Sequence, residues 1–325
     1  MLRYLLRRVL YALPILVLVN LLTFLLFFVV NSPDDMARMH LGDRYVTQAA
    51  IDKWKQDRGY NRPLLYASDR DGVDRLTDTI FFEKSVRLFA FDFGRADDGR
   101  DIGADIRTRM GPSLAIAVPV LLVGLALSIT AALLMALLRA TYVDYAGVFL
   151  AVTLMSISAL FYIIAGQYLM GKLLKLTPIS GYGEGFNTLK FLILPVAVSV
   201  IGQSGSTIRR YRTLFLEEVN RDYVRTARAK GANDTRVMFR HVLRNAMIPI
   251  LTGVVVIIPL LFIGSLVIES FFGIPGLGSY TIDAIRAQDF SIVRAMVFLG
   301  AVLYIIGLLL TDLSYTLVDP RVRLG

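Results

Sequence analysis

The chain has 325 residues, of which 55% are hydrophobic, with a mean hydropathy of +0.59 and a formal net charge of +9. It contains no cysteine, which excludes disulfides, thiolate metal sites and cysteine nucleophiles. Several apolar stretches approach the roughly 20 residues that an α-helix needs to cross a bilayer. The composition therefore predicts a polytopic membrane protein.

Apolar runs along the chain predict about six transmembrane helices. The first begins with basic residues but is too long for a signal peptide and is followed by no small-x-small cleavage site, so we expect it to be retained. The fourth is interrupted by Pro195 and Gly202, which leaves its ends open. The six runs cover roughly residues 9–30, 113–138, 146–170, 189–207, 246–268 and 292–317.

A large polar region, residues 31–112, separates the first two runs. It carries 14 basic and 15 acidic residues, together with turn-forming pairs such as Asp71-Gly72 and Asp98-Gly99. Apolar clusters within it favour a small folded or partly helical cap on the outer face. A loose solvated loop is the alternative, and the sequence does not decide between them.

The distribution of charge predicts the orientation. With six spans and a cytoplasmic N-terminus, the inner segments and Asp312 hold 16 basic and 7 acidic residues, whereas the remainder holds 19 of each. The bias of Lys and Arg toward cytoplasmic loops thus explains the net charge, and both termini are expected inside. Nucleic acid is not expected as a partner. The inner segments are 1–8, 139–145, 208–245 and 318–325.

The basic segment from Arg209 to Asn245 has internal order. Apolar residues recur every four positions at Phe215, Val219, Tyr223 and Ala227 and predict one helical stripe. Gly231 is expected to stop this helix, Asn233 or Asp234 to cap the next, and Pro249 to mark the start of the following span. Such a basic helix can lie against anionic membrane lipid or dock on a protein, and the pattern alone does not choose.

Motifs for catalysis are not found. Gly166 and Lys172 have the spacing of a phosphate-binding loop, but Leu173 occupies the position of the magnesium-binding Ser or Thr. His40 and His241 are expected on opposite sides of the membrane and thus cannot share a metal. The spans are nearly free of ionisable groups, which argues against a proton relay. We expect a non-enzymatic protein with no cofactor or metal of its own.

The run from Arg225 to Gly231 resembles the EAA loop of ABC-importer permeases, in which Glu-Ala-Ala precedes a glycine and a later Ile-x-Leu-Pro. Ala227, Gly231 and Leu243 fit that pattern. Arg225, Thr226, His241 and Arg244 depart from it. The departures are similar to the dipeptide and oligopeptide branch of the family, which the strings DYVRTARAKG (222–231) and RHVLRNAMIP (240–249) match closely.

Other strings extend this resemblance over nearly the whole chain, apart from about 64–88. They include the N-terminal LRYLLRRVLYALPIL and four further segments that occur in the order expected for the branch. These are FDFGR (91–95), ESFFGIPGLG (269–278), DLSY (312–315) and VDPR (318–321).

The resemblance implies an all-α type I ABC-importer permease in the bacterial cytoplasmic (inner) membrane, forming half of a heterodimeric pore. Its partners would be a second permease subunit, two cytoplasmic ATPase subunits that bind ATP, an external solute-binding protein and membrane lipid. The implied organisation is a first span (1–30), an extracytoplasmic region (31–112), a permease core (113–317) containing the coupling loop (208–245), and a tail (318–325). The implied ATPase-coupling residues are Tyr223, Arg225, Thr226, Ala227, Arg228, Ala229, Lys230 and Gly231.

The transported solute is less well defined. Short peptides are the first expectation by resemblance, while nickel chelates, glutathione and oligosaccharides remain open. An ion-gradient-driven secondary transporter and a non-transporting membrane scaffold are alternatives of other classes. Five polar residues on the spans are candidates for lining the pore, although packing between helices is the more common role of such groups. They are Ser156, Ser158, Gln203, Ser204 and Ser206.

Overall fold

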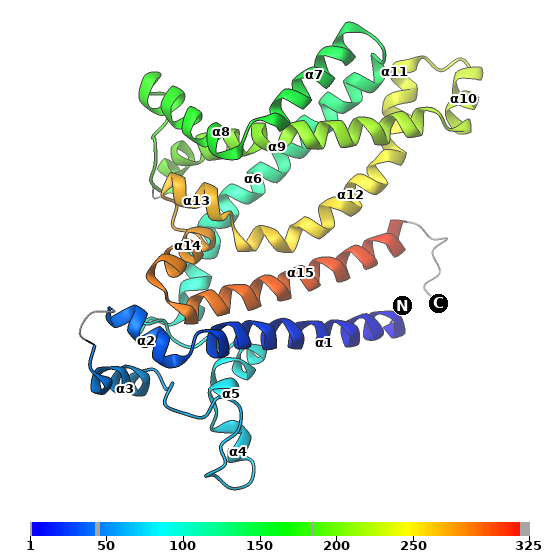
Figure 1. The fold of residues 1–325 in the computed structure, drawn as a ribbon. Helices are drawn as coiled ribbons and strands as arrows, with labels where there is room; N and C mark the ends of the chain where they lie inside the picture. Colours follow the sequence, from blue (N-terminus) through cyan, green and yellow to red (C-terminus); the bar gives the residue numbers. More distant parts are fainter. Residues whose placement is uncertain (1, 43–45, 184, 319–325) are drawn as a thin grey trace. The chain divides into compact units, whose positions relative to one another are not determined.

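The computed structural model describes residues 2–42, 46–183 and 185–318 (Figure 1). These residues form helices, and the bridge between Arg95 and Asp101 is the one pairing of extended backbone among them. The α-helices are α1 (Leu2–Leu25), α2 (Pro33–Leu41), α3 (Gln48–Asp57), α4 (Asp74–Thr77), α5 (Ile80–Lys84), α6 (Ile102–Leu137), α7 (Tyr142–Ser156), α8 (Ala159–Gly166), α9 (Thr188–Val219), α10 (Asp222–Ala229), α11 (Asp234–Val237), α12 (Leu243–Leu260), α13 (Leu266–Phe272), α14 (Leu277–Ala287) and α15 (Phe290–Val318).

Short segments of other helix types adjoin several of these helices. The 3₁₀ segments are Val86–Ala90, Gly185–Asn187 and Leu261–Ile263, and the π-helical segments are Leu26–Val30, Gln167–Leu173 and Met238–Val242.

Within the described residues, five helical stretches are long and apolar enough to cross a membrane, or six if a bent pair counts as one span. This confirms the predicted polytopic all-α architecture. The five are Leu10–Val30, Ile102–Leu137, Gly185–Val219, Asp234–Ile263 and Phe290–Leu313, and the bent pair is Tyr142–Ser156 with Ala159–Leu173.

The third predicted span corresponds to this bent pair of helices. α7 and the helix that follows it are bent by 92° at a short break. Ile157 is extended at this point, with φ −94° and ψ 133°, and the Ser158 hydroxyl accepts a hydrogen bond from the N–H of Phe161. Because an N-cap serine stabilises the start of a new helix, the break follows from the local sequence.

The fourth predicted span, in contrast, is one continuous helix and is longer than the predicted run of 189–207. α9 runs through both Pro195 and Gly202 and ends only at Val219. Gly202 lies against the ring of Tyr162, so its lack of a side chain serves close packing. Pro249 likewise lies inside α12 instead of starting it.

The chain divides into two compact units. Among the described residues, unit 1 comprises those up to Met110 together with Tyr280–Leu309, and unit 2 comprises Gly111–Ser279 and 310–318. In unit 1, α2, α3 and α5 enclose a buried apolar cluster with the end of α1, which includes Phe24, Phe28, Met36, Ile51, Trp54, Tyr60 and Ile80. The polar region is thus a folded helical body, and the loose-loop alternative is wrong.

Candidate functional site

The basic segment forms two consecutive helices instead of the single stripe predicted for Phe215 to Ala227. α9 ends at Val219, and α10 starts at Asp222 after Arg221, which is extended with ψ 151°. The N–H of Arg221 donates to the carbonyl of Glu218, so a tight turn joins the two helices. The predicted helix thus exists in two pieces, both with their apolar residues facing inward.

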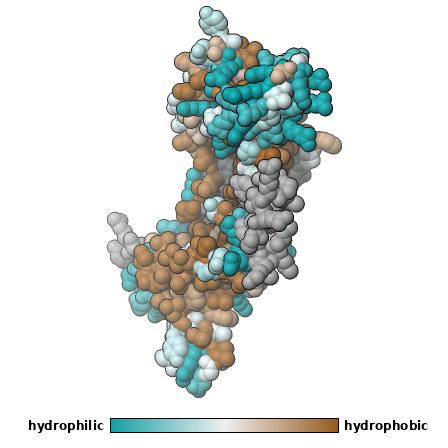
Figure 2. Space-filling model, turned by 90° about the vertical axis from the view of Figure 1, so that its right-hand side faces the viewer, coloured by the Kyte–Doolittle hydropathy of each residue, from teal (hydrophilic) through white to brown (hydrophobic). Residues whose placement is uncertain are grey.

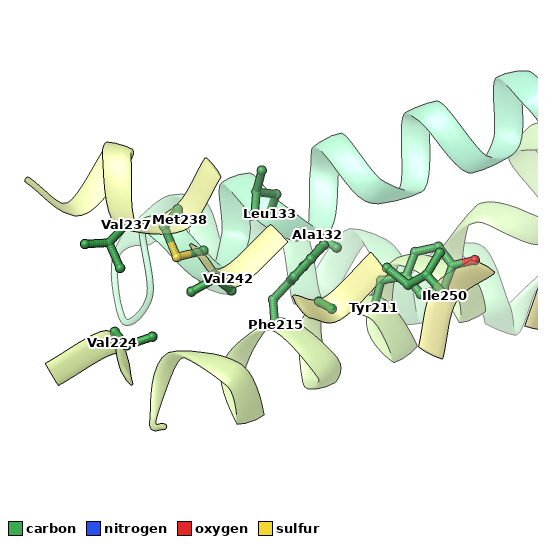
Figure 3. Packing of buried hydrophobic residues seen from close by; sticks show 11 residues of the cluster. Ala132, Leu133, Tyr211, Phe215, Val224, Val237, Met238, Val242 and Ile250 are labelled. Atoms are coloured by element: carbon green, nitrogen blue, oxygen red, sulfur yellow. The ribbon is translucent and has the colours of Figure 1, made fainter. Parts of the chain in front are cut away.

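The inner side of α10 packs on a buried apolar cluster of unit 2, which we call the loop core. Val224 and Phe215 are fully buried in it, and Tyr223 and Ala227 are half-buried against it. Figure 3 shows Val224 from α10 on the side of Val237, and Phe215 from α9 extending toward Ala132. The buried members are Ala132, Leu133, Ala136, Tyr211, Phe215, Val224, Val237, Met238, Val242, Ala246 and Ile250. The loop is therefore an ordered element.

The outer side of α10 and its turn is exposed and basic. The side chain of Arg225 is 75% exposed and that of Arg228 is 47% exposed. Their ion pairs, with Asp222 at 3.5 Å and Asp234 at 2.9 Å, are local and solvent-facing. Figure 2 shows hydrophilic residues gathered at the end of unit 2 that carries α10 and α11. We call the exposed members the basic face: Arg225, Thr226, Arg228, Ala229, Lys230 and Gly231.

Gly231 ends α10 as predicted, with a left-handed φ of 83°. A Cβ at this position would meet no atom within 4 Å, so the glycine is required by backbone conformation and not by crowding. The Asn233 side chain then accepts a hydrogen bond from the N–H of Arg236 at 2.9 Å, which confirms Asn233 as the cap of α11.

Tyr223 fixes α10 to the end of α9. Its hydroxyl donates to the carboxylate of Glu218 at 2.6 Å. Burial, followed by this hydrogen bond, raises the pKa of Tyr223 to about 12. The phenol therefore stays protonated at neutral pH, and it serves the packing of the loop instead of the basic face.

A buried ion pair connects α9 to α7. The Arg212 guanidinium donates to both oxygens of Asp144, at 2.7 and 2.8 Å, and the Asp144 side chain is only 3% exposed. A third hydrogen bond reaches Asp144 from the N–H of Ala140. Bidentate charge-assisted pairs of this kind are strong and directional. The sequence showed two isolated charges at these positions but not that they meet.

The candidate pore residues fall into two groups. Gln203 and Ser204 line a cavity of about 250 Å³ in unit 2, formed by α6, α9, α12 and the start of α13. Ser156, Ser158 and Ser206 are not among its lining residues. Ser156 and Ser206 are exposed, and their hydroxyls donate to backbone carbonyls on their own helices.

The string ESFFGIPGLG has a structural role that the sequence alone did not show. Glu269 is completely buried and accepts backbone N–H bonds from Ser265, Gly278 and Ser279 at 2.7–3.1 Å. A Cβ at Gly276 would collide with this carboxylate, so that glycine permits the close approach. Burial raises the pKa of Glu269, and these donors oppose the rise. The string therefore closes α13 onto the start of α14.

The residues from Gly166 to Leu173, whose spacing is similar to that of a phosphate-binding loop, are helical. Gly166 ends α8, and Gln167–Leu173 is a π-helical segment, so these residues do not form a phosphate-cradling loop. Among the residues that the structure describes, no group of three His, Asp or Glu side chains is placed to hold a metal ion.

Comparison with family models gives two matches. Residues 128–324 match the binding-protein-dependent transport system inner membrane component, and residues 1–68 match the N-terminal domain of such membrane components. The first match contains α7 to α13, and therefore the loop core, the basic face and most of the residues that line the cavity.

Individual relatives match between three quarters and nearly all of the chain. A Brucella suis biovar 1 protein named as a peptide permease is 31% identical over 99% of both chains. The Bacillus subtilis oligopeptide transport system permease protein AppB is 29% identical over 98% of this chain and 99% of its own. The Bacillus subtilis dipeptide transport system permease protein DppB is 32% identical over 75% of this chain and 78% of its own.

Proposed function

Because the chain belongs to the family of binding-protein-dependent transport system inner membrane components, we propose that it forms one half of the pore of an ATP-driven importer. It is a multi-pass membrane component and not itself an enzyme. In this proposal a second permease subunit completes the pore, two cytoplasmic ATPase subunits bind ATP, and an external solute-binding protein delivers the solute.

The observation that carries the proposal is the basic face held on the loop core. An exposed helix that is ordered by a buried apolar cluster presents a fixed shape to a partner, whereas a lipid-bound helix would present apolar residues to the bilayer. The apolar side of α10 is already occupied by Val224, Tyr223 and Ala227. This leaves the cations to pair with acidic groups of an ATPase groove.

Movement of α10 would reach the spans through two rigid connections. The loop core joins α10 to residues of α6, α9 and α12. The Arg212–Asp144 pair joins α9 to α7. Since packed helices move as units, closure of the ATPase subunits would shift these helices together.

Short peptides are the proposed solutes. Relatives of nearly full length are named for peptides and oligopeptides, which supports this class over nickel chelates, glutathione or oligosaccharides. The cavity lined by Gln203 and Ser204 is small and largely apolar, so it supports passage more than tight recognition. Selectivity would then lie mainly in the solute-binding protein.

Cysteine cross-linking tests ATPase docking directly, because the native chain has no cysteine. We expect Ala229→Cys, on the basic face, to cross-link to the ATPase partner in the membrane with a yield that changes on ATP binding. Ala227→Cys is the matched control two residues away, because Ala227 is half-buried against the loop core and is expected to react poorly.

Three outcomes would contradict the proposal. Equal cross-linking at both positions would mean that the observed face does not dock. Cross-linking of Ala229→Cys to lipid alone, together with solute uptake that is independent of ATP and abolished by collapsing the ion gradient, would instead support a secondary transporter. Absence of any uptake by the assembled proteins would favour a scaffold.

A further inference from the structure

A polar cavity of about 720 Å³ lies within unit 1, distant in sequence from the coupling loop. Its lining comes from the end of α3, from α5, from the chain between residues 87 and 101, and from the first turn of α15. This volume lies within the range of roughly 300–1,000 Å³ that is typical of sites for small molecules. Arg294, Lys84, Arg58 and Tyr60 are among the residues that line it.

Arg294 is the unusual member of this lining because it is buried without a direct ion pair. Only 4% of the residue is exposed. Its Nε donates to the carbonyl of Phe290 at 3.2 Å, one terminal nitrogen reaches the carbonyl of Lys84 at 3.4 Å, and its guanidinium lies 4.8 Å from the ring centroid of Phe28. No carboxylate of the described residues lies within 4.0 Å of it. A buried charge in this state is costly unless an anion joins it.

The least exposed carboxylates of the lining, on Asp97 and Glu83, pair with other groups, as does the nearby Asp289. Asp97 pairs with Arg58 at 2.9 Å, and Glu83 pairs with Arg62 at 2.6 Å. The buried Asp289 accepts backbone N–H bonds from Asp97, Ser291 and Ile292. Asp97 and Asp289 thus attract the charge of Arg294 through space, but neither forms a direct ion pair with it.

A second cation lies close to the same wall. The Lys84 side chain is 23% exposed, and its nearest carboxylate oxygen, on Glu83, is 3.4 Å away. Burial lowers the pKa of Lys84, as expected where its charge is incompletely compensated. The lining carries both signs of charge: Glu83 and Asp97 are as buried as Lys84, while Asp57, Asp92 and Asp101 are exposed.

We propose that this cavity binds the terminal carboxylate of a short peptide, with Arg294 as the residue that pairs with it. The assignment rests on the proposed import of peptides and adds a recognition site in unit 1 to it. A carboxylate matches the planar donor fork of a guanidinium and supplies the missing negative charge. Because both signs of charge line the cavity, a zwitterion can pair its carboxylate with Arg294 and its ammonium with one of the exposed acids.

The protein contains a natural reporter for this cavity. Trp54 is the single tryptophan of the chain. It is buried, its ring centroid lies 5.6 Å from that of Tyr60, and the Arg58 guanidinium lies 4.4 Å from it. Because Tyr60 and Arg58 line the cavity, a bound solute is expected to change the tryptophan fluorescence.

The test is a titration of the full chain in lipid nanodiscs, without ATPase subunits, followed by tryptophan fluorescence and by calorimetry. Trialanine should bind saturably, and trialanine amide, which lacks the carboxylate, should bind at least about tenfold more weakly. This comparison needs no variant and therefore does not depend on how a mutant folds. Arg294→Met should weaken trialanine binding by a similar factor, and Arg294→Lys should restore part of it.

Arg75→Met is the matched control, because Arg75 is an exposed arginine of unit 1 outside the cavity lining. Its affinity for trialanine should be unchanged. Equal affinity for trialanine and its amide, or no saturable signal by either method, would overturn the site. Neither result would affect the ATPase cross-link at Ala229, so failure of this site and failure of the proposed function are distinguishable.

Discussion

The basic face of unit 2 and the polar cavity of unit 1 both present arginine, but in opposite environments. The side chain of Arg225 is 75% exposed, whereas Arg294 is 4% exposed and has no carboxylate within 4.0 Å among the described residues. Exposed charges contribute little to stability and stay available to a partner, while a buried charge needs compensation where it lies. The exposed ion pairs of α10 thus contribute little to the stability of this loop, and the buried apolar residues of the loop core hold it in place.

The largest expected effect comes from truncating a buried side chain of the loop core on which α10 packs. Phe215→Ala should lower the free energy of unfolding by about 3–5 kcal/mol, because a completely buried ring is replaced by a cavity. Thermal unfolding of the purified chain measures this effect.

Phe239→Ala is the matched control, since Phe239 lies in the same loop but is 57% exposed. Its effect should be no more than about 0.5 kcal/mol. Similar losses for the two variants would mean that the loop core does not hold the loop together.

The second prediction concerns the Asp144–Arg212 pair. Asp144→Ala should destabilise the chain by about 3 kcal/mol, because it leaves the partly buried Arg212 guanidinium without its anion. The double variant Asp144→Ala, Arg212→Met should lose less than the sum of the two single changes, as a coupled pair requires.

Asp222→Ala provides the exposed counterpart, since the Asp222 side chain is 96% exposed and faces Arg225 at 3.5 Å. This variant should lose no more than about 0.5 kcal/mol of the free energy of unfolding. Additive losses in the Asp144–Arg212 double variant, measured by chemical unfolding, would contradict the proposed tie between α7 and α9.

The third prediction separates backbone conformation from crowding at Gly231. Gly231→Val should destabilise the loop by about 1–2 kcal/mol, because the residue has a left-handed φ of 83°. Gly231→Asn should lose less, since asparagine tolerates this conformation. ATPase capture through Ala229→Cys should fall in the same order.

Gly111→Ala is the control, because Gly111 lies within α6, has no left-handed φ and has equally open space at its Cβ position. It should not destabilise the protein, since alanine favours a helix. Normal capture by a stable Gly231→Val variant would count against a role of this turn in coupling.

Much of the fold followed from sequence because hydrophobic length and charge bias are local properties. The spans near residues 9–30 and 292–317, and the caps at Gly231 and Asn233, are examples. The break at Ile157 was missed because the apolar run continues across it, and its signal is Ser158, whose hydroxyl caps α8. The continuity of α9 through Pro195 was missed because tertiary packing overrides a local helix breaker.

Site residues were likewise found where the signal was local and missed where it depended on contacts far away in sequence. Tyr223 and Ala227 belong to a family string, but the periodicity alone had already placed them on an apolar stripe, and the structure orients them inward. Arg294 and Asp144 were not identified, since neither has a motif and each matters through residues far away in sequence. For Arg294 the available signal was a charge at the start of an apolar run.

The smallest effect on stability is expected for a change on the basic face, which should alter partner binding but not folding. Arg225→Ala should change the free energy of unfolding by less than about 0.5 kcal/mol, because its ion pair with Asp222 is solvent-exposed. The same change should slow ATPase capture and flatten its dependence on salt, since long-range attraction to an acidic groove acts on the association rate. Arg75→Ala, an exposed arginine of α4, should alter neither quantity. A loss of stability without a change in capture would instead make Arg225 a structural residue and leave the basic face without its proposed role.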